Sequence, residues 1–162
     1  MIKREAKYKI HNHISRYGKL KNFKISTRMM KHWWNVLNVA VFDNCLSAPN
    51  FEIKILRGGD GRGTYGECTG LYSFDKDGNR VLSVIIRLNH EMIFTREHFI
   101  AVLVHEMVHA WQFEYREEVM HDKRMSHGPT FTQWRDEIED IVGVKLETYM
   151  DEDDVLASWI TK

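Results

Sequence analysis

The chain has 162 residues and a mass of 19.3 kDa, the size of one ordinary domain, with no room for a second catalytic domain. Hydrophobic residues make up 43% and charged residues 28% of it, values that exclude a disordered chain. No apolar run approaches the roughly 20 residues that would cross a bilayer, and no apolar signal region follows the first residues. We therefore expect an intracellular, cytoplasmic protein without a membrane partner.

The two cysteines, Cys45 and Cys68, form no C-x-x-C pair. Their wide separation argues against a disulfide scaffold and against a zinc ribbon built from cysteines. We expect both to be buried free thiols.

Charge is balanced over the whole chain but is unevenly distributed. Lys plus Arg equals Asp plus Glu at 23 each, yet residues 1–31 carry a net charge of +9 and residues 132–162 a net charge of −6. Two interpretations are open. Either the two ends face each other or solvent, or the basic end contacts nucleic-acid phosphates.

The first predicted elements are a helix and a strand. Apolar residues recur at three- and four-residue spacings from about Thr27 to Ser47, which indicates an amphipathic helix. Phe51–Leu56 alternates apolar and polar residues as a strand does. The glycine-rich residues 57–63 that follow are expected to form a mobile loop, and their glycines lack the spacing of a phosphate-binding loop.

A β-hairpin is predicted next. The β-rich runs Thr69–Phe74 and Val81–Leu88 flank Asp77 and Gly78, a strong signal for a hairpin turn. The sheet is therefore expected to be antiparallel in this region.

Two helices complete the predicted elements. Thr95 is placed to cap a long helix over about residues 96–119, which is apolar nearly all round and therefore buried. A last helix is expected to begin at Pro129 and to end near Gly143.

The long helix carries His105-Glu106-Met107-Val108-His109, an H-E-x-x-H motif. Residues i and i+4 share a helix face, so His105 and His109 can direct ring nitrogens at one zinc ion about 2.0–2.1 Å away. Glu106 can then reach a water beside that ion. Two core histidines and a Glu paired with an arginine are the alternative, which must satisfy three buried polar groups at once.

A third ligand is needed, because catalytic zinc normally has three protein ligands and an open position. The helix face beyond His109 offers no convincing ligand, so the third ligand must follow after the chain turns. His127 is within reach of the returning chain, and the helix start at Pro129 would fix it. His121 and Asp122 are the competing ligands.

These motifs resemble one family. The stretch His105–Trp111, which reads HEMVHAW, and the later His127–Phe131, which reads HGPTF, are similar to the paired motifs of the SprT-like (Spartan-type) zinc metalloprotease domain. The segments Gly66–Tyr72 and Ile85–Asn89 add a weaker similarity. The resemblance spans about residues 28–143.

The resemblance implies a ligand set and a base. It assigns one Zn²⁺ per chain to His105, His109 and His127, and the role of general base to Glu106. Cellular members of the family cleave proteins covalently trapped on DNA, so the resemblance also implies a role in DNA–protein crosslink repair.

We therefore expect an α+β, zincin-like fold. A small, mainly antiparallel sheet would pack against the zinc-bearing HExxH helix, with flanking N- and C-terminal helices. The chain divides into a basic N-terminal segment (1–27), a SprT-like metalloprotease domain (28–143) and an acidic C-terminal segment (144–162).

The predicted function is zinc-dependent hydrolysis of peptide bonds, with Glu106 as the general base for a metal-activated water. One alternative is a zinc-stabilised nucleic-acid-binding or scaffolding domain without proteolytic activity. Another is a metal-dependent hydrolase that acts on something other than peptides.

Two partners are expected. The first is a protein substrate in an unfolded or extended state, which would add as a strand if Val81–Leu88 is an exposed edge. The second is DNA, held by the cations of residues 1–31 together with stacking on Tyr8, Tyr17 and Phe23.

Overall fold

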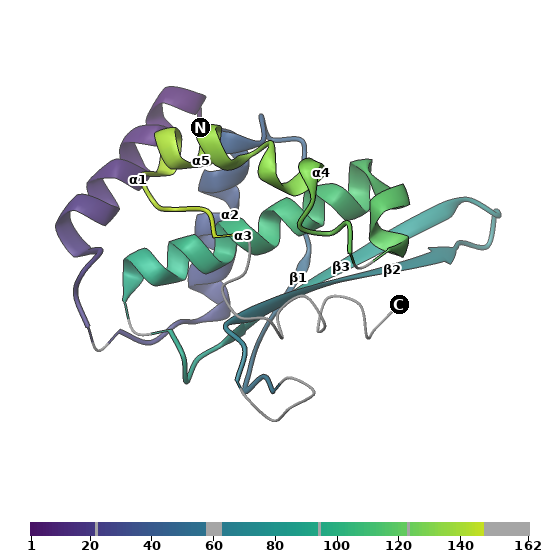
Figure 1. The fold of residues 1–162 in the computed structure, drawn as a ribbon, viewed down its shortest axis with the longest axis horizontal. Helices are drawn as coiled ribbons and strands as arrows, with labels where there is room; N and C mark the ends of the chain where they lie inside the picture. Colours follow the sequence, from purple (N-terminus) through teal and green to yellow (C-terminus); the bar gives the residue numbers. More distant parts are fainter. Residues whose placement is uncertain (22, 58–62, 94, 123, 148–162) are drawn as a thin grey trace.

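The computed structural model describes residues 1–21, 23–57, 63–93, 95–122 and 124–147. Most of the predicted mobile loop and of the acidic C-terminal segment lies outside these residues. The helices lie on one face of a small sheet (Figure 1). In chain order the elements are α1 (Lys3–Tyr17), α2 (Thr27–Val41), β1 (Asn50–Lys54), β2 (Gly66–Phe74), β3 (Arg80–Asn89), α3 (Arg96–Tyr115), the 3₁₀ helix η1 (Glu117–His121), α4 (Pro129–Thr132) and α5 (Arg135–Val142).

The predicted hairpin is confirmed as the antiparallel pair β2 and β3. Its turn is held by the Asp75 carboxylate, which accepts hydrogen bonds from the backbone N–H groups of Asp77 and Asn79. Gly78 takes the left-handed φ of 80° that the turn requires. The Asp77 and Gly78 turn signal therefore predicted this part of the sheet correctly.

The sheet as a whole is mixed, which corrects the prediction of a mainly antiparallel one. Its strand order is β1-β3-β2, and β1 runs parallel to β3. A hairpin signal concerns only the two strands next to the turn, and nothing in the sequence of β1 states which strand it joins.

The prediction that Val81–Leu88 is an exposed edge is wrong for Ile85–Leu88. These residues belong to β3, the central strand, which pairs with β2 from Arg80 to Leu88 and with β1 only over Ile85–Asn89. Ile86 and Leu88 of β3 are completely buried. A substrate strand cannot add beside Ile85–Leu88, because this part of β3 is already paired with both β1 and β2.

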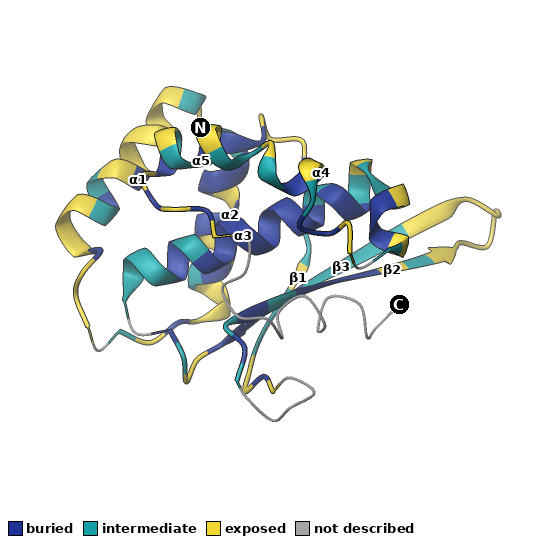
Figure 2. Cartoon of the chain, viewed as in Figure 1, coloured by how far each residue is buried: buried dark blue, intermediate teal, exposed yellow. Residues whose placement is uncertain are grey.

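Helix α3 is buried along most of its length, as its apolar sequence predicts (Figure 2). Thr95 caps it by accepting a hydrogen bond from the backbone N–H of His98. Against β2 the helix comes so close that a side chain at Gly70 would overlap the ring of Phe113. The absence of a side chain at Gly70 therefore lets the sheet approach the helix that carries the H-E-x-x-H motif.

Two predicted helix ends lie elsewhere. Helix α2 stops at Val41, well before Ser47, because Asp43 and Asn44 take positive φ angles that do not continue a helix. Helix α3 stops at Tyr115 and is followed by η1.

The last predicted helix does begin at Pro129 and end at Gly143, which adopts the left-handed conformation. It is broken, however, into α4 and α5.

The basic N-terminal residues are part of the fold, because α1 packs on α2 through Ala6, Ile10 and His13. Part of their charge is paired within the chain, since Lys3 lies 2.7 Å from Asp43.

Of the two cysteines, Cys68 is buried as expected and Cys45 is exposed, so the prediction for Cys45 is wrong. The described part of the chain contains no helix with the length and apolar character needed to cross a membrane.

His13 predicts a pH dependence of stability. Its ring packs on Trp33 with 4.2 Å between the ring centroids, and burial lowers its pKa to about 4, with smaller contributions from Arg96 and His32. In the unfolded chain the pKa of His13 is near 6.5, so the unfolded chain takes up this proton at a higher pH than the folded chain does. The stability present above pH 6.5 is therefore lost as the pH falls towards 4.

Thermal unfolding at pH 7 and pH 5 measures this effect on wild type and His13→Phe, a variant that keeps an aromatic ring on Trp33. Wild type should lose up to about 2 kcal/mol more than the variant over this range. An equal loss in both proteins would contradict the assignment to His13.

Candidate metal centre

Three histidine side chains from two parts of the chain meet in the interior. His105 and His109 lie one turn apart on α3, and His127 lies just before α4. The Nε2 atom of His127 is 3.1 Å from Nε2 of His109 and 3.3 Å from Nε2 of His105. All three residues are buried. The structure thus brings together the three histidines that the sequence analysis selected.

Hydrogen bonds on the outer ring atoms set the direction of two of these imidazoles. Nδ1 of His105 lies 3.0 Å from the backbone oxygen of Glu147, and Nδ1 of His109 lies 2.7 Å from Oε1 of Gln112. Both oxygens can only accept, so we assign the proton to Nδ1 in each ring. The Nε2 lone pairs of His105 and His109 therefore face the middle of the cluster.

The third imidazole, that of His127, is neutral at pH 7. Burial, followed by the neighbouring His109 and His105, lowers the pKa of His127 to about 2. A neutral ring keeps a lone pair that can bind a metal, whereas a protonated ring has none.

The donor set fits a divalent metal. Nitrogen atoms bound to one zinc ion at 2.0–2.1 Å in a tetrahedron are separated by about 3.3–3.4 Å, close to the 3.1 and 3.3 Å seen here. His105, His109 and His127 form the one group of three or more possible metal ligands within the described residues.

The competing ligands point elsewhere. His121 is largely exposed and lies 3.1 Å from Glu117, while Asp122 binds the guanidinium of Arg124. Neither belongs to the cluster. The returning chain reaches α3 at His127, which lies in the turn just before α4. Helix α4 begins at Pro129, as predicted.

Glu106, the predicted base, is 1% exposed on α3 next to His105. The phenyl ring of Phe131 closes the cluster from α4, with its centroid 4.8 to 5.0 Å from the centroids of all three imidazoles. This apolar wall keeps the local dielectric low, which strengthens electrostatic interactions at the centre.

Sequence reasoning missed two groups that orient the histidines. Gln112 lies on the helix face beyond His109 that offered no convincing ligand, yet its amide contacts His109 directly. A polar residue three positions after His109, inside an otherwise apolar helix, is the signal that could have found it. The Glu147 carbonyl that contacts His105 is a backbone group, so no residue type could have marked it.

The fold and the site together define an α+β domain with a buried three-histidine cluster built on an H-E-x-x-H helix. A comparison with family models matches residues 30–150 to the SprT-like family. The chain belongs to that family, which confirms the resemblance found in the sequence. Searches of curated proteins and of solved structures gave no significant match.

Zinc content tests the third histidine. His127→Ala leaves two ligands on α3 and should lower the zinc affinity at least about 100-fold, since two imidazoles do not complete a stable site. His121→Ala, which removes an imidazole that contacts Glu117, is the matched control and should keep one zinc per chain. Elemental analysis after dialysis measures both. Full zinc occupancy in His127→Ala would remove His127 from the ligand set.

Proposed function

We propose that this protein is a zinc-dependent metallopeptidase. The observation that carries the proposal is the convergence of three Nε2 atoms, two of them oriented by hydrogen bonds on Nδ1. Membership in the SprT-like family supports it. His105, His109 and His127 would hold one Zn²⁺, which supplies a Lewis acid that polarises a peptide carbonyl and activates water.

The protein residues then have distinct roles. His105, His109 and His127 would hold the ion as three uncharged ligands and so would leave it a stronger Lewis acid than a carboxylate ligand would. Glu106 accepts the proton of the attacking water and delivers it to the leaving amine nitrogen. Phe131 excludes bulk water from one side of the site, so a proton taken by Glu106 stays with the reacting groups.

Glu106→Gln tests the mechanism, because the amide keeps the size of the side chain but cannot accept the proton. We expect zinc binding to be retained and hydrolysis of an unfolded protein substrate to fall about 10²–10⁴-fold. Glu114→Gln, the same change on the same helix at a residue that binds Ser47, should remain active.

The outcomes separate the competing functions. A fully active Glu106→Gln protein would contradict the role of Glu106. A wild-type protein that binds zinc but cleaves neither proteins nor peptides would favour the zinc-stabilised binding or scaffolding domain.

We propose that the substrate is an unfolded or extended protein segment. The three imidazoles are at most 7% exposed, so only a thin, extended chain has the shape to reach them. A comparison of cleavage rates for one protein in its folded and unfolded states tests this proposal.

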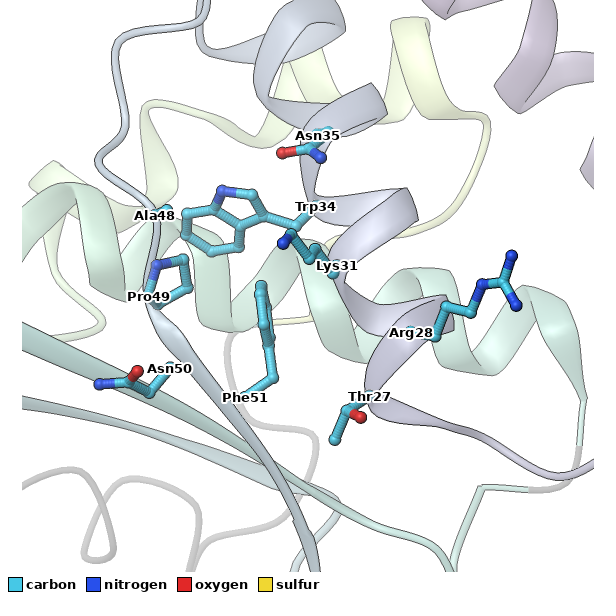
Figure 3. Close-up of a pocket in the computed structure, with 9 residues that line it drawn as sticks. All are labelled: Thr27, Arg28, Lys31, Trp34, Asn35, Ala48, Pro49, Asn50 and Phe51. Atoms are coloured by element: carbon cyan, nitrogen blue, oxygen red, sulfur yellow. The ribbon is translucent and has the colours of Figure 1, made fainter.

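We also propose DNA as a partner of the basic end of the chain. A hollow of about 440 Å³ lies between α2 and β1, with Trp34, Phe51 and Pro49 as its apolar wall and Arg28 and Lys31 on its α2 side (Figure 3). A second hollow of about 390 Å³ lies farther along β1, between Ile53 and residues 23–25.

Charge favours a polyanion at these two hollows. Lys24, Arg28 and Lys31 line them, and none of the described lining residues is acidic, although the chain has as many acids as bases. Cations interspersed with aromatic rings are the usual means of binding single-stranded nucleic acid without sequence preference.

Two matched charge reversals test this partner. Replacing Lys24, Arg28 and Lys31 with Glu should weaken binding of single-stranded DNA at least about tenfold and reduce the salt slope by about 2, at roughly 0.7 per lost phosphate contact. Replacing Lys7, Lys9 and Arg16 of α1 with Glu changes the net charge equally and should have a smaller effect. Equal losses would mean that net charge alone attracts DNA, and no binding by wild type would exclude this partner.

A further inference from the structure

Gln112 is a buried residue that hydrogen-bonds both to His109 on α3 and to the loop that supplies His127. It is completely buried on α3, three residues after His109. Its Oε1 atom lies 2.7 Å from Nδ1 of His109, and its Nε2 atom donates to the Ser126 backbone oxygen and to Thr130 Oγ1, both at 2.9 Å. Both hydrogens of the amide nitrogen are therefore used.

The orientation of this amide follows from the Ser126 carbonyl. A backbone oxygen can only accept, so the NH₂ group of Gln112 must face Ser126 and its Oε1 must face His109. A flipped amide would place two oxygen atoms, Oε1 and the Ser126 oxygen, against each other. With Oε1 facing His109, only a protonated Nδ1 makes a hydrogen bond, and the lone pair of His109 is then on Nε2.

The same amide also positions the third histidine. Ser126 immediately precedes His127, and Thr130 follows it by three residues in the first turn of α4. The two hydrogen bonds from Gln112 therefore hold the chain on both sides of His127. They hold it to the helix that carries His105 and His109, so the distances among the three Nε2 atoms depend on this contact.

We propose that Gln112 is the positioning residue of the metal centre: it fixes the Nδ1–H tautomer of His109 and ties the His127 loop to α3. This inference rests on the proposed zinc site. Groups that orient metal ligands in this way commonly change metal affinity about 10- to 100-fold when they are removed.

Zinc affinity of the full chain, measured by competition with a fluorescent chelator, tests the proposal. Gln112→Leu removes all three hydrogen bonds and should bind zinc about 10- to 100-fold more weakly. Thr130→Val, which removes one partner of the amide and keeps the side-chain shape, should bind several-fold more weakly. Gln133→Leu is the matched control, because that amide is exposed and donates only to the Thr130 backbone oxygen; its affinity should equal that of wild type.

The tautomer of His109 gives a second readout that a purely structural role would not change. Imidazole ¹⁵N shifts of the metal-free protein should show Nδ1–H alone in wild type and in Gln133→Leu, and a mixture of tautomers in Gln112→Leu.

Zinc affinity within twofold of wild type in Gln112→Leu would overturn the proposal. If Gln112→Leu does not fold, the same result in Thr130→Val overturns it. A wild-type protein that binds zinc without cleaving peptides overturns only the proposed function, so the two failures are distinguishable.

Discussion

Three imidazole Nε2 atoms that meet at one point inside an apolar interior are the constraint on which the rest of the structure depends. The Nε2 atom of His127 lies 3.1 and 3.3 Å from those of His109 and His105, so the surrounding chain must hold the three rings where one cation can bind all of them. The Glu147 carbonyl and the Gln112 amide do this for two of the rings. The positions of these two rings therefore depend on the packing that holds these two oxygens in place.

That packing comes from the burial of α3. The helix is held between the sheet on one side and the chain segments around α4 on the other, and Gly70 allows β2 to approach it at Phe113. A helix buried on all sides cannot rotate to present a different face. His105 and His109 therefore stay on the side of α3 that meets Phe131 and His127.

The features that sequence could predict are those set by local geometry. The i to i+4 spacing placed His105 and His109 on one helix face, Asp77 and Gly78 marked the hairpin turn, and Pro129 marked the helix after His127. The parallel partner of β1 and the contact of Gln112 with the His127 loop could not be predicted in the same way. Both depend on which distant segments meet, and neither residue type nor periodicity encodes that.

The hollows at the basic end of the chain and the helix that carries His105 and His109 lie beside different strands of the sheet. The hollows lined by Lys24, Arg28 and Lys31 border β1, whereas α3 contacts β2 and β3 and makes no comparable contact with β1 within the described residues. Because β1 and β2 are opposite edges of a three-stranded sheet, about 10 Å lies between their backbones. A nucleic acid along β1 would therefore occupy the sheet edge opposite β2, and α2, which borders the first hollow and packs on α3, would connect it to the helix that carries His105 and His109.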